Sequence, residues 1–139
     1  MLLKDKVCVI TGAASPRSIG YATAELFAAH GARLAVPDIA MDDDALAEIS
    51  ARISTRIGSP ARIWGARCDI RSAEECRKAV ESIVTQFGTI DCLVNCAGIV
   101  KSQSLKSITE ADYDDILNVN LKGTFNICRS VLEVLTDRR

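Results

Sequence analysis

The 139-residue sequence contains no run of 18 or more apolar residues, no basic patch and no C-x-x-C pair. The first absence argues against a membrane span. A formal net charge of −1, with Arg and Lys scattered among acids, argues against nucleic acid as a partner. His30 is the only histidine beside six cysteines, so no metal site is expected. We expect the cysteines to be small buried side chains of a cytoplasmic protein, because the polar N-terminal residues do not resemble a signal peptide.

The composition is that of an ordinary globular protein, with 48% hydrophobic and 25% charged residues. Short apolar runs alternate with amphipathic stretches, without repeats, low-complexity segments or linkers. Strands are predicted at 6–11, 33–37, 62–68 and 90–95, and helices at 19–30, 42–57, 72–87 and 110–137. This order predicts an α/β fold with a doubly wound, Rossmann-like parallel sheet, in one domain that spans residues 1–139.

Gly12 and Gly20 bracket the turn between the first strand and the first helix. A turn without side chains lets backbone amides approach a pyrophosphate, and the helix N-terminus supplies unpaired N–H groups and partial positive charge. The two glycines are therefore candidate cofactor contacts, and residues 1–139 are a candidate dinucleotide-binding domain. A tight strand-to-helix turn without a ligand is the alternative that the pattern leaves open.

Asp38 follows the second predicted strand, 18 residues after Gly20. At that position in a dinucleotide fold, a carboxylate accepts hydrogen bonds from both hydroxyls of the adenosine ribose, and it would repel a 2′-phosphate. Asp38 thus favours NAD over NADP. The alternative is a solvated loop acid.

Four ordered motifs resemble those of the short-chain dehydrogenase/reductase family: Thr11-Gly12 through Ser18-Ile19-Gly20, Cys68-Asp69-Ile70, Val94-Asn95-Cys96-Ala97-Gly98 and Asn118-Val119-Asn120. The resemblance covers nearly the whole chain. It implies an NAD(P)-dependent oxidoreductase that transfers hydride between the nicotinamide and a small-molecule alcohol or ketone. It also implies that Gly12, Ser18, Ile19 and Gly20 wrap the pyrophosphate, Asp38 binds the ribose, Asp69 and Ile70 the adenine, and Asn95, Ala97 and Gly98 line the cofactor floor, while Asn120 is catalytic and holds a water in a proton relay.

The glycine loop departs from the family pattern. It is two residues longer than usual, Ser18 replaces its middle glycine, and Cys96 replaces an asparagine. Serine is a good helix N-cap, and its hydroxyl could reach a phosphate. Arg17 resembles the basic residue with which the family selects NADP, and so opposes the NAD preference drawn from Asp38. We give Asp38 the greater weight.

The family's catalytic Tyr-x-x-x-Lys pair and serine have no counterpart in these 139 residues. Tyr21 is followed at that spacing by Glu25, and Tyr113 by Leu117. We therefore expect a fold truncated after its fourth strand and the following long helix, inactive alone and part of a longer enzyme. A non-catalytic NAD(P)-binding or regulatory module is the alternative. An interaction protein that uses the long helix is a third.

The predicted helix 110–137 carries more apolar residues than one packed face needs, among them Leu121, Ile127, Val131 and Leu135. The resemblance implies a homo-oligomer assembled through this helix. Some of these side chains would then be interface and others core.

Overall fold

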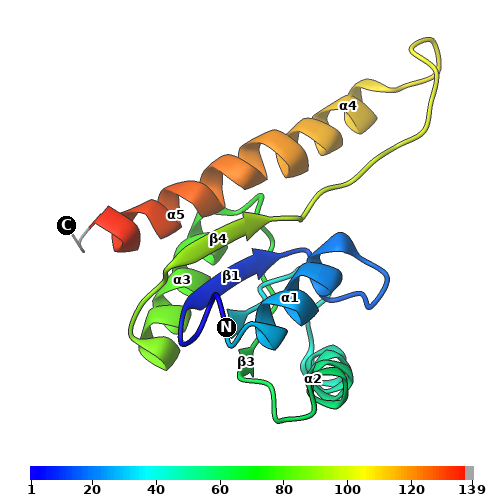
Figure 1. Ribbon diagram of the computed structural model, residues 1–139. Coiled ribbons are helices and arrows are strands. Elements are labelled where there is room, and N and C mark those ends of the chain that lie inside the picture. Colours follow the sequence, from blue (N-terminus) through cyan, green and yellow to red (C-terminus); the bar gives the residue numbers. More distant parts are fainter. Residues whose placement is uncertain (137–139) are drawn as a thin grey trace.

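The computed structural model describes residues 1–136 of the chain and contains one four-stranded parallel sheet, ordered β3-β2-β1-β4 (Figure 1). Its strands are β1 (Val7–Thr11), β2 (Arg33–Ala35), β3 (Ile63–Trp64) and β4 (Cys92–Asn95). In the register, Val9 of β1 lies between Ala35 of β2 and Leu93 of β4. The predicted doubly wound parallel fold is confirmed, and β4 stands at one edge of the sheet.

Helices cover both faces of the sheet. The first face packs against α1 (Ile19–Ala29) and α2 (Asp43–Ile57), and the second against α3 (Ala73–Phe87) and α5 (Thr124–Thr136). Alternation along β1 explains both layers, because successive strand residues point to opposite faces. Val7 and Val9 join the α3/α5 core, whereas Cys8 and Ile10 join the α1/α2 core, all four fully buried.

The predicted strand at 62–68 is longer than the observed β3. After Trp64 the chain leaves the ladder and returns to it only in the isolated bridge between Arg67 and Asp38. The Arg67 bridge keeps residues 68–70 close to the end of β2, since the amide of Cys68 donates to the Asp38 carbonyl at 3.0 Å.

The predicted continuous helix at 110–137 is three segments, and residue 137 lies outside the described part. α4 (Glu110–Leu117) is followed by a π-helical segment, η1 (Asn118–Gly123), and then by α5. In Figure 1, α4, η1 and α5 together form one rod, which lies along β4 and whose α4 end projects past the sheet. None of the α4 residues is buried.

Six thiols are free, and Cys8, Cys68 and Cys76 are buried while the other three are half-buried. Burial first, and then the neighbouring Cys92, raise the pKa of Cys8 to about 12. Over residues 1–136 no helix is long and apolar enough to cross a membrane, and no group of three His, Cys, Asp or Glu side chains is arranged to hold a metal.

Candidate functional site

A cleft of about 410 Å³ lies at the carboxyl ends of the strands. The strand order sets its contents, because parallel strands end at the same edge. Asp69 follows β3, Asp38 follows β2, Gly12 follows β1 and Ala97 follows β4, and all four line the cleft. Residues far apart in the sequence are therefore arranged in a row across the sheet.

The glycine turn fits only residues without a side chain. Gly12 has a φ of +73°, and a Cβ there would lie 2.6 Å from the backbone N of Ala97. A Cβ on Gly20 would collide with the Gly12 carbonyl group, at 2.8 Å from its carbon. This close packing joins the ends of β1 and β4 to the start of α1.

Ser18 is the N-cap of α1. Its Oγ accepts from the backbone N of Tyr21 at 3.0 Å and donates to the Ser15 carbonyl at 2.8 Å. The hydroxyl lines the cleft, but its donor is already used within the loop. Ser18 therefore orients the helix N-terminus toward the cleft, and a phosphate would meet it chiefly through backbone amides.

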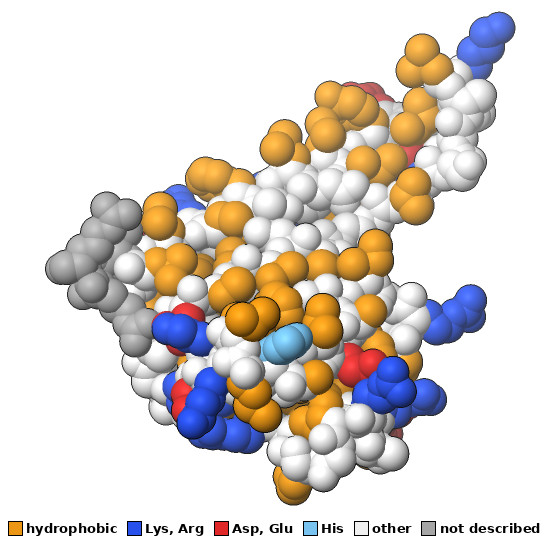
Figure 2. All heavy atoms as spheres, in the orientation of Figure 1, with side chains coloured by type: hydrophobic (Ala, Val, Ile, Leu, Met, Phe, Trp, Pro, Cys, Tyr) orange, Lys and Arg blue, Asp and Glu red, His pale blue; other side chains and the backbone are white. Residues whose placement is uncertain are grey.

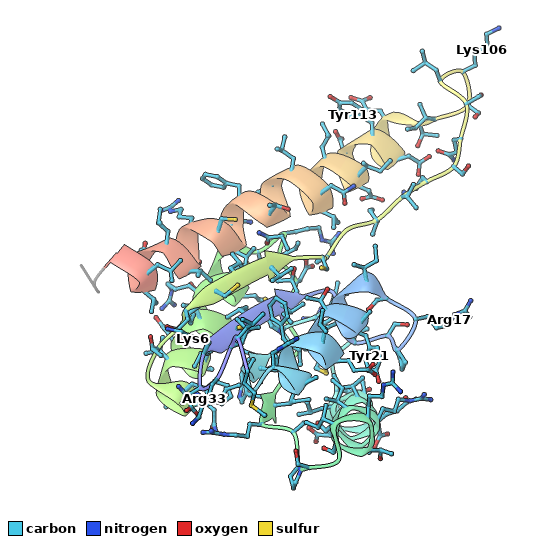
Figure 3. The ribbon with its side chains drawn as sticks, in the orientation of Figure 1. Lys6, Arg17, Tyr21, Arg33, Lys106 and Tyr113 are labelled. Atoms are coloured by element: carbon cyan, nitrogen blue, oxygen red, sulfur yellow. The ribbon has the colours of Figure 1, made fainter. Side chains whose placement is uncertain are left out.

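The structure places Arg17 and Ile19 outside the cleft wall. Arg17 extends away from the body of the protein in Figure 3, and Ile19 is 80% exposed. Gly20 is buried beneath the turn. Arg17 stands in the lengthened glycine loop, and its outward direction could not be predicted from the sequence pattern.

Asp38 lines the middle of the cleft and is held by two backbone amides. Its Oδ2 accepts from Ala14 at 3.0 Å and its Oδ1 from Ala40 at 2.8 Å. Each carboxylate oxygen has a second lone pair. Ala14 belongs to the glycine loop, so this contact fixes the carboxylate relative to the turn that would hold the pyrophosphate.

Asp69 and Ile70 form the end of the cleft beyond Asp38. The Asp69 carboxylate pairs with the Arg71 guanidinium, with contacts of 2.7 to 3.1 Å, and with the Arg71 amide at 3.0 Å. Hydrogen bonds from the Arg71 side chain, opposed by partial burial, hold the pKa of Asp69 below its usual range. Sequence reasoning missed Arg71, although its position two residues after the acid is a signal for such pairing.

Asn120 lies in η1 and forms two hydrogen bonds with the segment after β4. Its Oδ1 accepts from the Ile99 amide and its Nδ2 donates to the Ile99 carbonyl, both at 2.8 Å. Ala97 and Gly98 line the cleft, but Asn95 is exposed and turns to α5, where Nδ2 contacts Cys128 Sγ at 3.3 Å. The structure therefore brings Ala97 and Gly98 into the site and leaves Asn95 and Asn120 outside its lining.

A family model described as enoyl-(acyl carrier protein) reductase matches residues 12–138. An uncharacterized short-chain type dehydrogenase/reductase of Sinorhizobium fredii is 42% identical over 127 residues, which cover 91% of this chain and 49% of that protein. The chain belongs to the short-chain dehydrogenase/reductase family. It spans about half the length of the curated relatives it matches.

Two other members of this short-chain family are informative. The 3-oxoacyl-(acyl-carrier-protein) reductase of Thermotoga maritima is 36% identical over 139 residues, 100% of this chain and 54% of that protein. A solved variant of the actinorhodin polyketide ketoreductase with NADPH superimposes with a TM-score of 0.83 at 27% identity, covering 96% of this chain and 49% of that structure. Proteins of this kind are oxidoreductases that bind nicotinamide cofactors and act on small molecules.

Other cleft residues of this short-chain family member were not predicted: Pro37, Ile39, Cys68, Arg71, Cys96, Ile99, Asp115 and Val119. Asp115 reaches the cleft from α4, and its carboxylate is 2.9 Å from Lys101 Nζ. Lys101 also contacts Asp112 at 2.6 Å. This ion pair joins α4 to the segment after β4. It could not be predicted from the sequence, because the spacing of its residues does not follow a helix or strand period.

Proposed function

We propose that the chain is the cofactor-binding half of an NAD-dependent short-chain oxidoreductase that interconverts an alcohol and a ketone. When bound, the nicotinamide supplies hydride chemistry. Gly12, Gly20 and the N-terminus of α1 would hold the pyrophosphate, and Ala97 and Gly98 would form the floor at the nicotinamide end. The position of the glycine turn carries this proposal, because Gly12 and the N-cap residue Ser18 line the cleft where the N-terminus of α1 meets it.

The position of Asp38 supports NAD over NADP. The carboxylate is anchored by Ala14 and Ala40 and faces the cleft, where it can accept from two ribose hydroxyls. A 2′-phosphate would meet a fixed negative charge. Arg17, the residue that favours NADP in the sequence pattern, points away from the protein in Figure 3.

A fluorescence titration with NADH and NADPH tests the proposal. We expect tighter binding of NADH. Asp38→Ala should weaken the binding of NADH by about 1–3 kcal/mol, because hydrogen bonds to the ribose are lost. The difference in affinity between NADH and NADPH should then become smaller. Arg17→Ala changes the glycine loop that Asp38 contacts through Ala14, and it should leave the affinities for NADH and NADPH unchanged. A preference for NADPH that Arg17→Ala abolishes would refute the NAD assignment, and no binding of either cofactor at millimolar concentration would refute the cofactor site.

Asn120 is proposed as a residue of the proton relay through its backbone rather than its amide. The amide is committed to Ile99, and the Asn120 carbonyl accepts from Thr124 Oγ1 at 2.8 Å. A carbonyl has two lone pairs, so a water can share this oxygen. Asn120→Ala keeps this carbonyl and removes only the hydrogen bonds to Ile99, so complete loss of turnover in that variant would contradict the backbone role. Turnover of the complete protein itself separates the enzyme from a non-catalytic NAD(P)-binding module.

Self-association through the long helix also stays a prediction, as does a cytoplasmic location. η1 and α5 expose several large apolar side chains, and Figure 2 shows hydrophobic side chains along the outer side of the rod. Leu121 is 67% exposed, Phe125 59% and Leu132 57%. A second copy of the chain is the proposed partner of this face.

A further inference from the structure

Arg71 presents unused donors beside the acceptor at the end of the cleft. Its Nε and Nη2 bind the Asp69 carboxylate, whereas Nη1 makes no hydrogen bond within residues 1–136. Both residues line the cleft. The pair therefore offers an anionic acceptor and a cationic donor side by side.

The segment that carries this pair is fixed from two helices. Asn126 of α5, only 5% exposed, donates through Nδ2 to the carbonyls of Ile70 at 2.9 Å and Arg71 at 3.2 Å. Glu75 of α3 accepts from the Asp69 amide at 2.7 Å. Ser72 caps α3 by accepting from the Glu75 amide at 3.2 Å, and the Glu75 carboxylate binds the Asp69 amide instead of the Ser72 amide.

The ion pair keeps the acceptor charged. Contact with Arg71 lowers the pKa of Asp69, and the hydrogen bond with Asp69 raises that of Arg71, to which the Asp115 charge across the cleft also contributes. Apolar side chains complete the same cleft, namely Ile39, Ile70 and Val119. A flat ring with a polar edge suits such surroundings.

The order of donor and acceptor discriminates between purines. Adenine has an amino group, which donates, next to a ring nitrogen, which accepts. The Asp69 carboxylate can accept from the amino group while Arg71 donates to the ring nitrogen. Hypoxanthine replaces the amine with a carbonyl oxygen, which would face the Asp69 carboxylate. A site built to bind a donor rejects an analogue that lacks it, because its own polar groups are left unpaired.

We propose that Arg71 is a specificity-determining residue: with Asp69 it forms a donor–acceptor pair that reads the amino edge of adenine and rejects a 6-oxo purine. The inference rests on the proposed dinucleotide site. It adds selection of the base, and it assigns that selection to a residue outside the motifs in the sequence.

The test compares NADH with reduced nicotinamide hypoxanthine dinucleotide, which carry the same fluorescent group. The unchanged protein should bind NADH at least about tenfold more tightly. Arg71→Ala should reduce that preference to within about threefold, mainly by weakening NADH. Arg71→Lys retains the charge without the planar fork and should be intermediate. Arg71→Gln retains a donor without the charge and gives a second neutral variant.

Arg67→Ala is the matched control, since Arg67 is also exposed and paired, with Glu75 at 3.2 Å, but does not line the cleft. It should leave the base preference unchanged. Equal binding of both dinucleotides by the unchanged protein, or an undiminished preference in both neutral variants, overturns the role of Arg71. Tighter NADH binding by Arg71→Ala also refutes the role of Arg71, because Arg71 would then be keeping the base from binding Asp69. Failure of both dinucleotides to bind refutes the proposed function instead.

Discussion

The hydroxyl of Thr11 accepts a hydrogen bond from the backbone amide of Ala97 at 3.1 Å. The same Oγ1 accepts from Cys96 at 3.2 Å, so one buried oxygen at the end of β1 holds the turn that follows β4. The two strand ends that would flank the cofactor are thereby locked together.

Thr11→Val should destabilise the fold by about 1–3 kcal/mol, because the substitution keeps the shape of the side chain and leaves buried amides without their acceptor. Urea denaturation measures the change. Thr11→Ser retains the oxygen and should cost only about 1 kcal/mol for the lost methyl group. Equal losses in the two variants would show that the methyl group, and not the hydrogen bonds, stabilises this junction.

Gly12→Ala should cost far more stability than Gly58→Ala. Both glycines have a φ of +73°, which costs an alanine about 1–2 kcal/mol. Only Gly12 has a neighbour in the way, since no atom lies within 4 Å of a Cβ on Gly58. The difference between the two free energies of unfolding isolates the collision with Ala97, and similar values would contradict the close packing of β1 against β4.

Asn120→Ala should release the segment after β4 without unfolding the sheet. The substitution removes both hydrogen bonds to Ile99. Hydrogen exchange at the Ile99 amide should accelerate by about tenfold or more, in line with the loss of about 1–2 kcal/mol of local stability. Exchange of the Val9 amide in β1 serves as the reference and should stay slow. Unaltered protection at Ile99 would contradict the interaction.

Acid should weaken the contact between Lys101 and Asp112. Hydrogen bonds from Lys101, and then from Thr109, hold the pKa of Asp112 below its ordinary value. A carboxyl whose folded pKa is lowered stabilises the fold above its unfolded pKa of about 3.9, and this contribution is lost as the pH falls through the folded pKa. Asp112→Asn should therefore lower Tm at neutral pH. Below about pH 4, the Tm of this variant should decrease less with falling pH than that of the unchanged protein. Asp114→Asn, on the same helix, should leave the wild-type profile intact.

Phe125→Glu should weaken self-association, because it puts a charge at the centre of the exposed apolar face of η1 and α5. Sedimentation velocity reports the mass in solution. Leu26→Glu on α1 is the matched control, since Leu26 is 57% exposed on another surface. An oligomer that survives Phe125→Glu would refute this face as its interface, as would dissociation caused equally by Leu26→Glu.

The order of strands and helices could be predicted because each buried strand is a short apolar run ended by a polar residue or glycine. That order also predicts the row from Asp69 through Asp38 and Gly12 to Ala97, since parallel strands place their carboxyl ends on one edge. The cleft thus followed largely from periodicity and spacing.

Side-chain direction and local pairing could not be predicted in this way. Arg17 points outward from the lengthened loop, and the Glu75 carboxylate accepts from the Asp69 amide rather than from the Ser72 amide. The π-helical segment was missed since Asn118–Gly123 is compatible with α-helical periodicity. Each of these depends on the course of the backbone in three dimensions, which residue type and spacing do not encode.

The π-helical segment holds one residue more than an α-helical path of the same rise would need. Each residue of an α-helix turns the chain by about 100°. Refolding these same residues as α-helix would therefore rotate everything before the segment by about that angle relative to α5, whereas deleting one residue between Asn118 and Gly123 would give a continuous α-helix with α4 in its present orientation. After such refolding Asp115 would leave the cleft, while Ile127 and Val131 stayed in the core. The segment therefore sets the rotation of α4 relative to α5, and loss of its wider turn would reorient one wall of the cleft.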